Sequence, residues 1–282
     1  MKPRLASLLF VGGIIGIIFA IGSCCIHINS QPQEHYERTE NLSVSMAGIK
    51  QIKVDTSFGD VKIVGSDTSE CSVAAKITGN APTKEEAKQL AEDKKIKFET
   101  EGATLVIKAE KPSHKNNRNV GVSYDIAIPT KTAIKCDTSF GVVELKNITG
   151  DIVANTSFGK IRADTIAGKI NLDTSYGEVD CEQITTGDFY AKSSFGRMKI
   201  NFSDDCPPDL KAKIETSFGE IDADIPSNFA GTVTVETSFG KIRTELPITV
   251  NGEIGNDHLK GTIGQGNGSL DLKTSFGSVT IK

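Results

Sequence analysis

The sequence predicts an all-β protein, a parallel β-solenoid (β-helix) with coils of about 18–23 residues and one inserted α-helix near residues 83–95. Three observations predict this fold: a recurring tetrapeptide, alternating apolar side chains around it, and charges that reverse sign from one copy to the next. With 38% hydrophobic residues and 27 glycines in 282 residues, the composition is typical of a folded β-rich chain rather than a disordered one.

The unit Thr-Ser-Phe-Gly recurs eight times with small variations. Its aromatic residues are Phe58, Phe140, Phe158, Tyr176, Phe195, Phe218, Phe239 and Phe276. From Phe140 to Phe239 successive spacings are 18 to 23 residues, the length of one solenoid coil. We therefore expect a structural aromatic stack, with each ring on the buried face, where burial contributes about 1.5–3 kcal/mol.

Apolar and polar residues alternate on both sides of each glycine. In the first copy the alternation runs from Ile52 to Phe58, and it resumes from Val61 to Ile63 after Gly59. This two-residue period is that of a strand with one buried face. Glycine suits the bend because it adopts positive φ and lets neighbouring backbones approach closely. Each copy is therefore predicted to be two short strands joined by a tight corner.

Charged side chains distinguish a parallel stack of coils from an antiparallel meander. The two outward positions after each glycine form an inter-coil charge ladder, which consists of Lys160 and Arg162, Glu178 and Asp180, Arg197 and Lys199, Glu220 and Asp222, and Lys241 and Arg243. Parallel in-register strands about 4.8 Å apart would place every charge between two of opposite sign. An exposed ion pair contributes only about 0.2–1 kcal/mol, so we expect the ladder to fix register and coil order more than stability.

The N-terminal segment, residues 1–28, is a targeting element. An apolar run from Leu5 to Ile28 follows a basic start, as in a signal peptide. Ile21-Gly22-Ser23-Cys24 resembles a bacterial lipobox, which predicts that Cys24 is lipidated and anchors the chain to the membrane. An uncleaved signal-anchor helix is the alternative, because about 20 apolar residues suffice to span a bilayer; simple secretion is a third possibility.

The remaining chain is predicted to comprise a polar tether, residues 29–45, and a solenoid domain, residues 46–282. Thr83 to Glu86 has capping-box character and starts the inserted helix. We interpret residues 46–128 as coils that carry this helix, with a small separate β-sandwich as the alternative, and residues 129–282 as regular coils.

The cysteines lack the paired spacing of zinc sites. Cys136 and Cys181 fall on inward positions and are expected to be buried. A disulfide such as Cys71 to Cys136 is compatible with an extracytoplasmic compartment, but the sequence does not determine the state of Cys71, Cys136, Cys181 and Cys206. We expect no metal and no cofactor.

Two stretches, Tyr36-Glu37-Arg38-Thr39 and IKVDTSFGDVKIVG from Ile52, together with the repeated TSFG units, resemble the bacterial putative-adhesin family over about residues 46–282. The resemblance implies a parallel β-solenoid behind a signal peptide, lipobox or membrane helix. It also implies a link to adhesion or, for some members, to envelope stress responses. It brings no catalytic residues.

The predicted function is that of a membrane-anchored, non-enzymatic bacterial envelope protein that serves adhesion, binding or scaffolding at the cell surface. Its predicted partners are the membrane, through the N-terminal lipid or helix, and a cell-wall glycan, an envelope protein or a second copy. Nucleic acid is not expected, because 32 basic and 36 acidic residues are well mixed and give a net charge of −4.

Three alternatives remain. An envelope-stress sensor or regulatory protein is compatible with the sequence. A polysaccharide-acting β-helix enzyme would need clustered carboxylates; Asp137 and Asp173 lie in one predicted column, but Asn155 and Lys192 occupy neighbouring positions of it. Ice binding through the outward serines of the repeats is disfavoured by the charges beside them.

Overall fold

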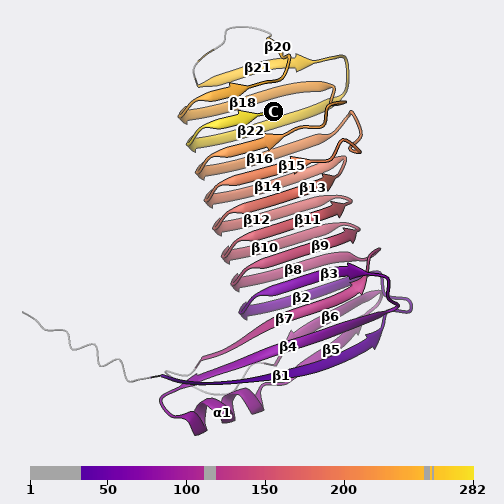
Figure 1. Ribbon diagram of the computed structural model, residues 1–282, viewed down its shortest axis with the longest axis vertical. Helices are drawn as coiled ribbons and strands as arrows, with labels where there is room; N and C mark the ends of the chain where they lie inside the picture. The colour runs from indigo at the N-terminus through magenta and orange to yellow at the C-terminus, as the bar shows by residue number, and fades with distance from the viewer. Residues whose placement is uncertain (1–32, 111–118, 251–254, 256) are drawn as a thin grey trace, which may run out of the picture. The chain divides into compact units, whose positions relative to one another are not determined.

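The computed structural model describes residues 33–110, 119–250, 255 and 257–282 (Figure 1). In this part of the chain, strands form two sheets. Sheet A has the order β1 (Glu34–Ser45), β4 (Glu70–Ala81), β7 (Asn119–Pro129), β3 (Val61–Ser66), β9 (Val143–Thr149), β11 (Ile161–Ala167), β13 (Val179–Thr185), β15 (Met198–Phe202), β17 (Ile221–Asp224), β23 (Val279–Ile281) and β19 (Ile242–Thr244).

Sheet B has the order β20 (Thr249–Val250), β21 (His258–Ile263), β18 (Gly231–Phe239), β22 (Gly268–Phe276), β16 (Lys211–Phe218), β14 (Asp188–Phe195), β12 (Ile170–Tyr176), β10 (Ile152–Phe158), β8 (Ala133–Phe140), β2 (Gln51–Phe58), β6 (Thr104–Ala109) and β5 (Ile96–Glu101). From β8 to β17 the chain passes alternately between the sheets, so each coil adds one strand to both. Equivalent strands pair in parallel and in register; Ile152, for example, lies opposite Ile134 and Ile170. The predicted all-β fold with parallel strands is confirmed.

An apolar core fills the space between the sheets, and a small second cluster of Ala81, Ala87 and Leu90 lies at α1. Inward residues of successive coils, such as Ile134, Ile152 and Ile170, are fully buried, and most of the residues that alternate with them are polar. The cysteines of the described residues, Cys71, Cys136, Cys181 and Cys206, are buried and free, so the Cys71–Cys136 disulfide considered from the sequence is not formed. Burial raises the pKa of the Cys71 thiol to about 11 and that of Cys136 to about 12.

The tetrapeptide builds the corner between the sheets. A Cβ atom on Gly177 would lie 1.9 Å from the carbonyl oxygen of Gly159 in the preceding coil, so only glycine allows this approach. The Oγ1 of Thr174 donates a hydrogen bond of 3.1 Å to the same carbonyl. Ser193 and Thr216 bond the next glycine carbonyls in the same way. Threonine and glycine are thus corner residues that tie each coil to its neighbour.

Residues 34–45, predicted to belong to a polar tether, instead form β1, which pairs antiparallel with β4. This prediction was wrong because alternate residues of the segment, including Leu42 and Val44, pack against the core despite their polar neighbours. Arg38 adds a second tie. Its Nε and Nη2 donate to the carbonyls of Ala91 and Lys94, at 2.8 and 2.6 Å, at the end of helix α1 (Lys84–Asp93).

Helix α1 lies where the sequence predicts it, and the Oγ1 of Thr83 caps it by accepting a bond from the Glu86 amide. The strands around it follow neither interpretation of residues 46–128. They are not regular coils, because β4 is antiparallel to β7 and β5 to β6. They are not a separate sandwich either, because they extend sheets A and B. Together with β1 they form an N-terminal cap beside α1 (Figure 1).

The last coil in the sequence is not the last coil in space. Strands β22 and β23 insert between β16–β17 and β18–β19, and β21 then pairs antiparallel with β18. Lys273 is placed to favour this order: it lies opposite both Glu215 and Glu236, and its Nζ is 2.7 Å from a Glu236 carboxylate oxygen. Without the inserted coil the two glutamates would face each other.

Candidate interaction surface: an exposed aromatic ladder

The aromatic residues of the repeats form one column, which we call the aromatic ladder. In spatial order it consists of Phe58, Phe140, Phe158, Tyr176, Phe195, Phe218, Phe276 and Phe239. Adjacent ring centroids are 4.8–5.0 Å apart, and the ring planes differ by 0–9°. The in-register coils therefore hold the rings parallel at the spacing of neighbouring strands.

The ladder is exposed, which corrects the expectation that its rings are buried. Seven residues are 41–50% exposed, and Phe239, at the end, is 67% exposed. The threonine two positions earlier, 1% exposed at Thr174, is the last inward side chain. The strand bends after it, so the following ring leaves the alternation and points outward. Tyr176 is the residue from which this exposure could be predicted, because a phenol hydroxyl needs a hydrogen-bonding partner and water supplies one at an exposed site.

Stacking determines what a ligand meets. Each ring covers the faces of its neighbours, so solvent reaches a row of ring edges. Phe239, 67% exposed at one end, keeps an open face, whereas Phe58 at the other end is 41% exposed, no more than the rings inside the column. Sugar rings bind aromatic side chains by stacking on open faces. The ladder does not offer those faces along its length, whereas an apolar partner surface can pack against the edges.

A largely polar column runs beside the ladder, formed by the residue after each corner glycine. In spatial order this flanking column is Asp60, Val142, Lys160, Glu178, Arg197, Glu220, Ser278 and Lys241. Lys160 Nζ lies 3.1 Å from carboxylate oxygens of both Glu178 and Asp180, and Arg197 bonds Asp222, which raises the pKa of its guanidinium. Three cations and three anions leave the column without net charge.

The predicted charge ladder continues two residues further along each strand. Arg162 lies opposite Glu144 and Asp180 and bonds Glu144 at 2.9 Å, and Lys199 lies opposite Asp180 and Asp222 and bonds Glu182. One predicted step is wrong: Glu220 and Asp222 do not face Lys241 and Arg243. The inserted β22–β23 coil places Ser278 and Thr280 between them.

Comparisons with known proteins agree with this architecture. The family model Toastrack DUF4097 matches residues 49–282. The chain belongs to the Toastrack DUF4097 family. No curated protein matches the chain. The resemblance to adhesin-type proteins inferred from the sequence is confirmed.

Solved structures similar to this Toastrack chain include a putative cell adhesion protein from Clostridium sporogenes ATCC 15579, with 16% identity, 88% of this chain and 99% of that chain covered, and a TM-score of 0.40. A putative adhesin from Bacteroides fragilis NCTC 9343 has 11% identity, coverage of 87% and 97%, and a TM-score of 0.43. A putative adhesin from Parabacteroides distasonis ATCC 8503 has 13% identity, coverage of 88% and 97%, and a TM-score of 0.44.

The carboxylates of the Toastrack chain that could suggest an enzyme form ordinary surface interactions. Asn155 Nδ2 donates to Asp137 Oδ1 at 2.7 Å, and Asp173 lies opposite Asn155 and Lys192. Burial raises the pKa of Asp173. The described residues contain no group of three His, Cys, Asp or Glu side chains placed to hold a metal ion.

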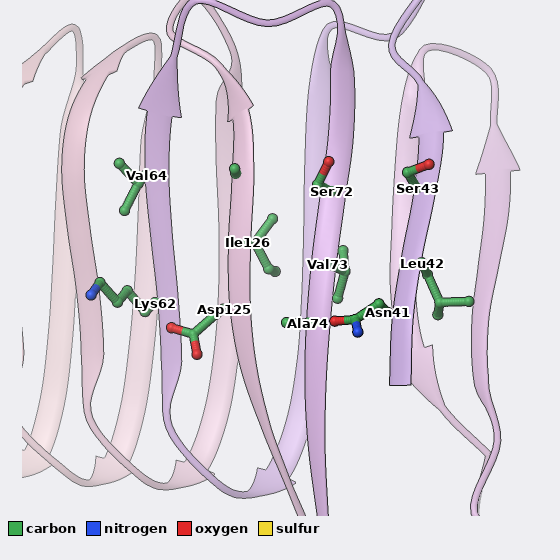
Figure 2. Close-up of a pocket in the computed structure, with 11 residues that line it drawn as sticks. Asn41, Leu42, Ser43, Lys62, Val64, Ser72, Val73, Ala74, Asp125 and Ile126 are labelled. Carbon is green, nitrogen blue, oxygen red and sulfur yellow. The ribbon is translucent and has the colours of Figure 1, made fainter. Parts of the chain in front are cut away.

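A shallow hollow of about 550 Å³ lies on the outer face of sheet A near the N-terminal cap (Figure 2). Small side chains such as Ser43, Ser72 and Ala74 create it, and Lys62 and Asp125 on neighbouring strands line its side. Its lining contains one carboxylate and neither His nor Cys, so it offers no paired acids and no nucleophile with a base.

The predicted lipidation residue, Cys24, and the whole targeting segment lie outside the described residues. Within the described part of this Toastrack chain, no helix has the length and apolar character needed to cross a membrane.

Proposed function

We propose that this Toastrack protein is a non-enzymatic, membrane-anchored protein of the bacterial cell envelope whose β-solenoid, with coils of about 18–23 residues, serves adhesion, binding or scaffolding at the cell surface. The observation that carries the proposal is the exposed aromatic ladder. A covered aromatic side chain buries about 150–250 Å², so eight half-exposed residues present roughly 600–1,000 Å². Apolar patches of that size mark interaction sites.

The construction of the corner supports a binding role. Close glycine contacts and threonine hydrogen bonds hold each coil against the preceding one. A ladder fixed in this way loses little conformational freedom when a partner binds, which lowers the entropic cost of association. The threonine and glycine residues that recur in the repeats serve to build the corner. The carboxylates Asp137 and Asp173 alternate with Asn155 and Lys192 instead of forming a cluster, which favours a non-enzymatic role.

Membrane anchoring rests on the sequence of residues 1–28, with lipidation of Cys24 favoured over a signal-anchor helix. Since β1 begins at Glu34, only residues 25–33 separate a lipidated Cys24 from the folded body. Replacement of Cys24 by Ser is expected to abolish incorporation of a labelled fatty acid into the protein. Absence of labelling in the wild type would instead favour the signal-anchor helix.

The binding role is tested with the full chain on cells that express it. A ring variant, F158S/F195S, removes two central members of the ladder, and a control variant, S157A/S194A, changes their outward neighbours without altering the rings. We expect the ring variant to keep its β-sheet circular dichroism and to lose at least tenfold in adherence to cells or purified cell walls. Equal adherence of both variants would mean that the ladder is not the binding surface.

A further inference from the structure

We propose that the aromatic ladder binds the ladder of a second copy of this chain, in antiparallel orientation. This inference rests on the proposed binding function and names its partner. Three independent features of the described residues support it: the ring spacing, the order of charges in the flanking column, and the area that pairing would cover.

The ring spacing favours a partner with the same repeat. Centroids recur every 4.8–5.0 Å over seven intervals. A partner that repeats every 5.4 Å, as one turn of α-helix does, would drift out of step by about 3 Å or more along this length. A second copy keeps the same step throughout, so every ring edge can find an equivalent place between two rings of the partner.

The flanking column is self-complementary when read in reverse. Its charges run negative, neutral, positive, negative, positive, negative, neutral and positive from Asp60 to Lys241. A twofold axis perpendicular to the ladder places this column against the same column of the partner, with its order inverted. Asp60 then faces Lys241, Lys160 faces Glu220, and Glu178 faces Arg197, each in both directions. The two neutral residues, Val142 and Ser278, face each other.

The same charges select one register. A shift of the partner by one coil in one direction places Lys160 opposite Arg197 of the second copy and Glu178 opposite Glu178 of the second copy. A slip in the other direction places Glu178 opposite Glu220 and Arg197 opposite its own equivalent. Like charges held together destabilise an interface and exclude wrong arrangements. A parallel pair about an axis along the ladder would set the column against the partner's outward serines and leave its charges without partners.

The available area is sufficient for a specific dimer. The half-exposed rings present roughly 600–1,000 Å² per copy, a range that includes the approximately 800 Å² per partner of a standard interface. The flanking column adds a polar rim, so the arrangement has the apolar centre and charged border of a protein–protein interface.

Antiparallel pairing has a consequence for adhesion. The N-terminal cap adjoins the Phe58 end of the ladder, because its strand β6 pairs with β2. The caps of two paired copies therefore lie at opposite ends of the joint ladder. With the proposed N-terminal anchors, this orientation suits copies on two facing envelopes, and the contact is homophilic.

A charge-swap experiment tests the pairing. An acidic variant, K160E/R197E, makes the four central positions of the column negative, and a basic variant, E178K/E220K, makes them positive. The full-length proteins are reconstituted in separate vesicle populations, and clustering is followed by light scattering. We expect wild-type vesicles to cluster, each variant alone to cluster at least tenfold less, and a mixture of the two variants to recover clustering.

A variant that fails to cluster because repulsion within one copy disrupts its fold would not recover clustering on mixing. Recovery in the mixture therefore distinguishes lost contacts between copies from a folding defect. A control variant, K53E/K135E, reverses two neighbouring lysines on the outward face of sheet B and should cluster as the wild type does. The pairing is overturned if wild-type vesicles do not cluster or if the mixture does not recover. If F158S/F195S still reduces adherence to cell walls in that case, the proposed binding function stands and the partner is a different molecule.

Discussion

At the scale of single residues, the corner tetrapeptide divides its tasks. Glycine allows the backbone of one coil to approach that of the next, threonine satisfies the carbonyl at the point of approach, and the aromatic residue is left outside. Close approach and hydrogen bonding concern the same atom, the glycine carbonyl oxygen. The repeat is therefore a packing unit first, and the ladder is the surface that this packing leaves exposed.

The close approach predicts a large effect for Gly177→Ala. The new Cβ would lie 1.9 Å from the Gly159 carbonyl oxygen, which is backbone and cannot move aside without shifting a coil. We expect a loss of about 1–3 kcal/mol of stability, as for other overpacked sites, measured by urea unfolding. Gly187→Ala is the control: its nearest neighbour is the Pro207 Cγ at 3.5 Å. Equal midpoints for the two variants would contradict this account of the corner.

The threonine hydroxyl permits a second comparison at the same scale. Thr174→Val removes the donor to the Gly159 carbonyl and leaves that carbonyl unsatisfied, at a cost of about 1–3 kcal/mol. Thr138 is buried, but its Oγ1 has no hydrogen-bonding partner among the described residues. Thr138→Val should therefore be neutral or stabilising. Thermal unfolding of the two variants distinguishes these outcomes. A loss of stability in Thr138→Val as large as that in Thr174→Val would refute the role assigned to the Thr174 hydroxyl.

At the scale of strands, the sequence pattern predicted where each strand lies along the chain better than it predicted which strands pair with one another. Alternation and the period of about 20 residues predict the strands from β8 to β17 and their parallel register, because each coil stacks on the preceding one in sequence. The insertion of β22–β23 breaks that rule. The sequence did contain a signal for it: Lys273 is the residue that separates Glu215 from Glu236, but it is recognised only when chain order and spatial order are considered separately.

Other differences have similar physical causes. The residues of β1 are predominantly polar, and their place in sheet A depends on contacts with β4 and on the bonds from Arg38 to α1, which the local sequence does not encode. The exposure of the aromatic ladder was not predicted because the in–out alternation of each strand was continued from the corner threonine to the aromatic residue two positions later. That residue lies beyond the bend, where the alternation no longer holds. In both places a distant contact or a local change of backbone direction overrides the periodic pattern.

The role of Lys273 predicts the behaviour of the inserted coil. Lys273→Glu would place three like charges in adjacent strands, opposite one another, and would remove the ion pair with Glu236. We expect faster amide hydrogen exchange in β18 and β22 and little change in β10 and β12. Lys273→Gln, which removes the charge without reversing it, should have a smaller effect. Unchanged exchange in β18 and β22 of K273E would show that other contacts determine the order of coils.

At the scale of the whole molecule, stability and recognition use different parts of the same repeat. The continuous core between the sheets supplies the apolar burial, whereas the exposed ion pairs beside the ladder contribute little stability each. Those charges are consequently free to encode register, within the stack and, in the proposed dimer, between copies. Changes in the charge column should alter association more than unfolding.

The buried thiols make the core sensitive to alkaline pH. Burial raises the folded-state pKa of Cys71 to about 11 and that of Cys136 to about 12, from an ordinary value of 9.0. The folded chain therefore holds these protons while the unfolded chain loses them. The contribution is fully present below pH 9, and stability falls as the pH rises from about 9 towards 11–12. At pH 10.5 each thiol should account for about 2 kcal/mol of lost stability.

The measurement is urea unfolding between pH 8 and 10.5 for the wild type and for C71A/C136A. Lysines in surface ion pairs, such as Lys199 and Lys273, have raised pKa values and also lose their contribution as the pH rises, but they do so equally in both proteins. The double variant should begin less stable, because it leaves space in the core, and should lose less stability over this range. Parallel pH profiles would mean that the thiols ionise without cost, which is incompatible with a dry core between the sheets.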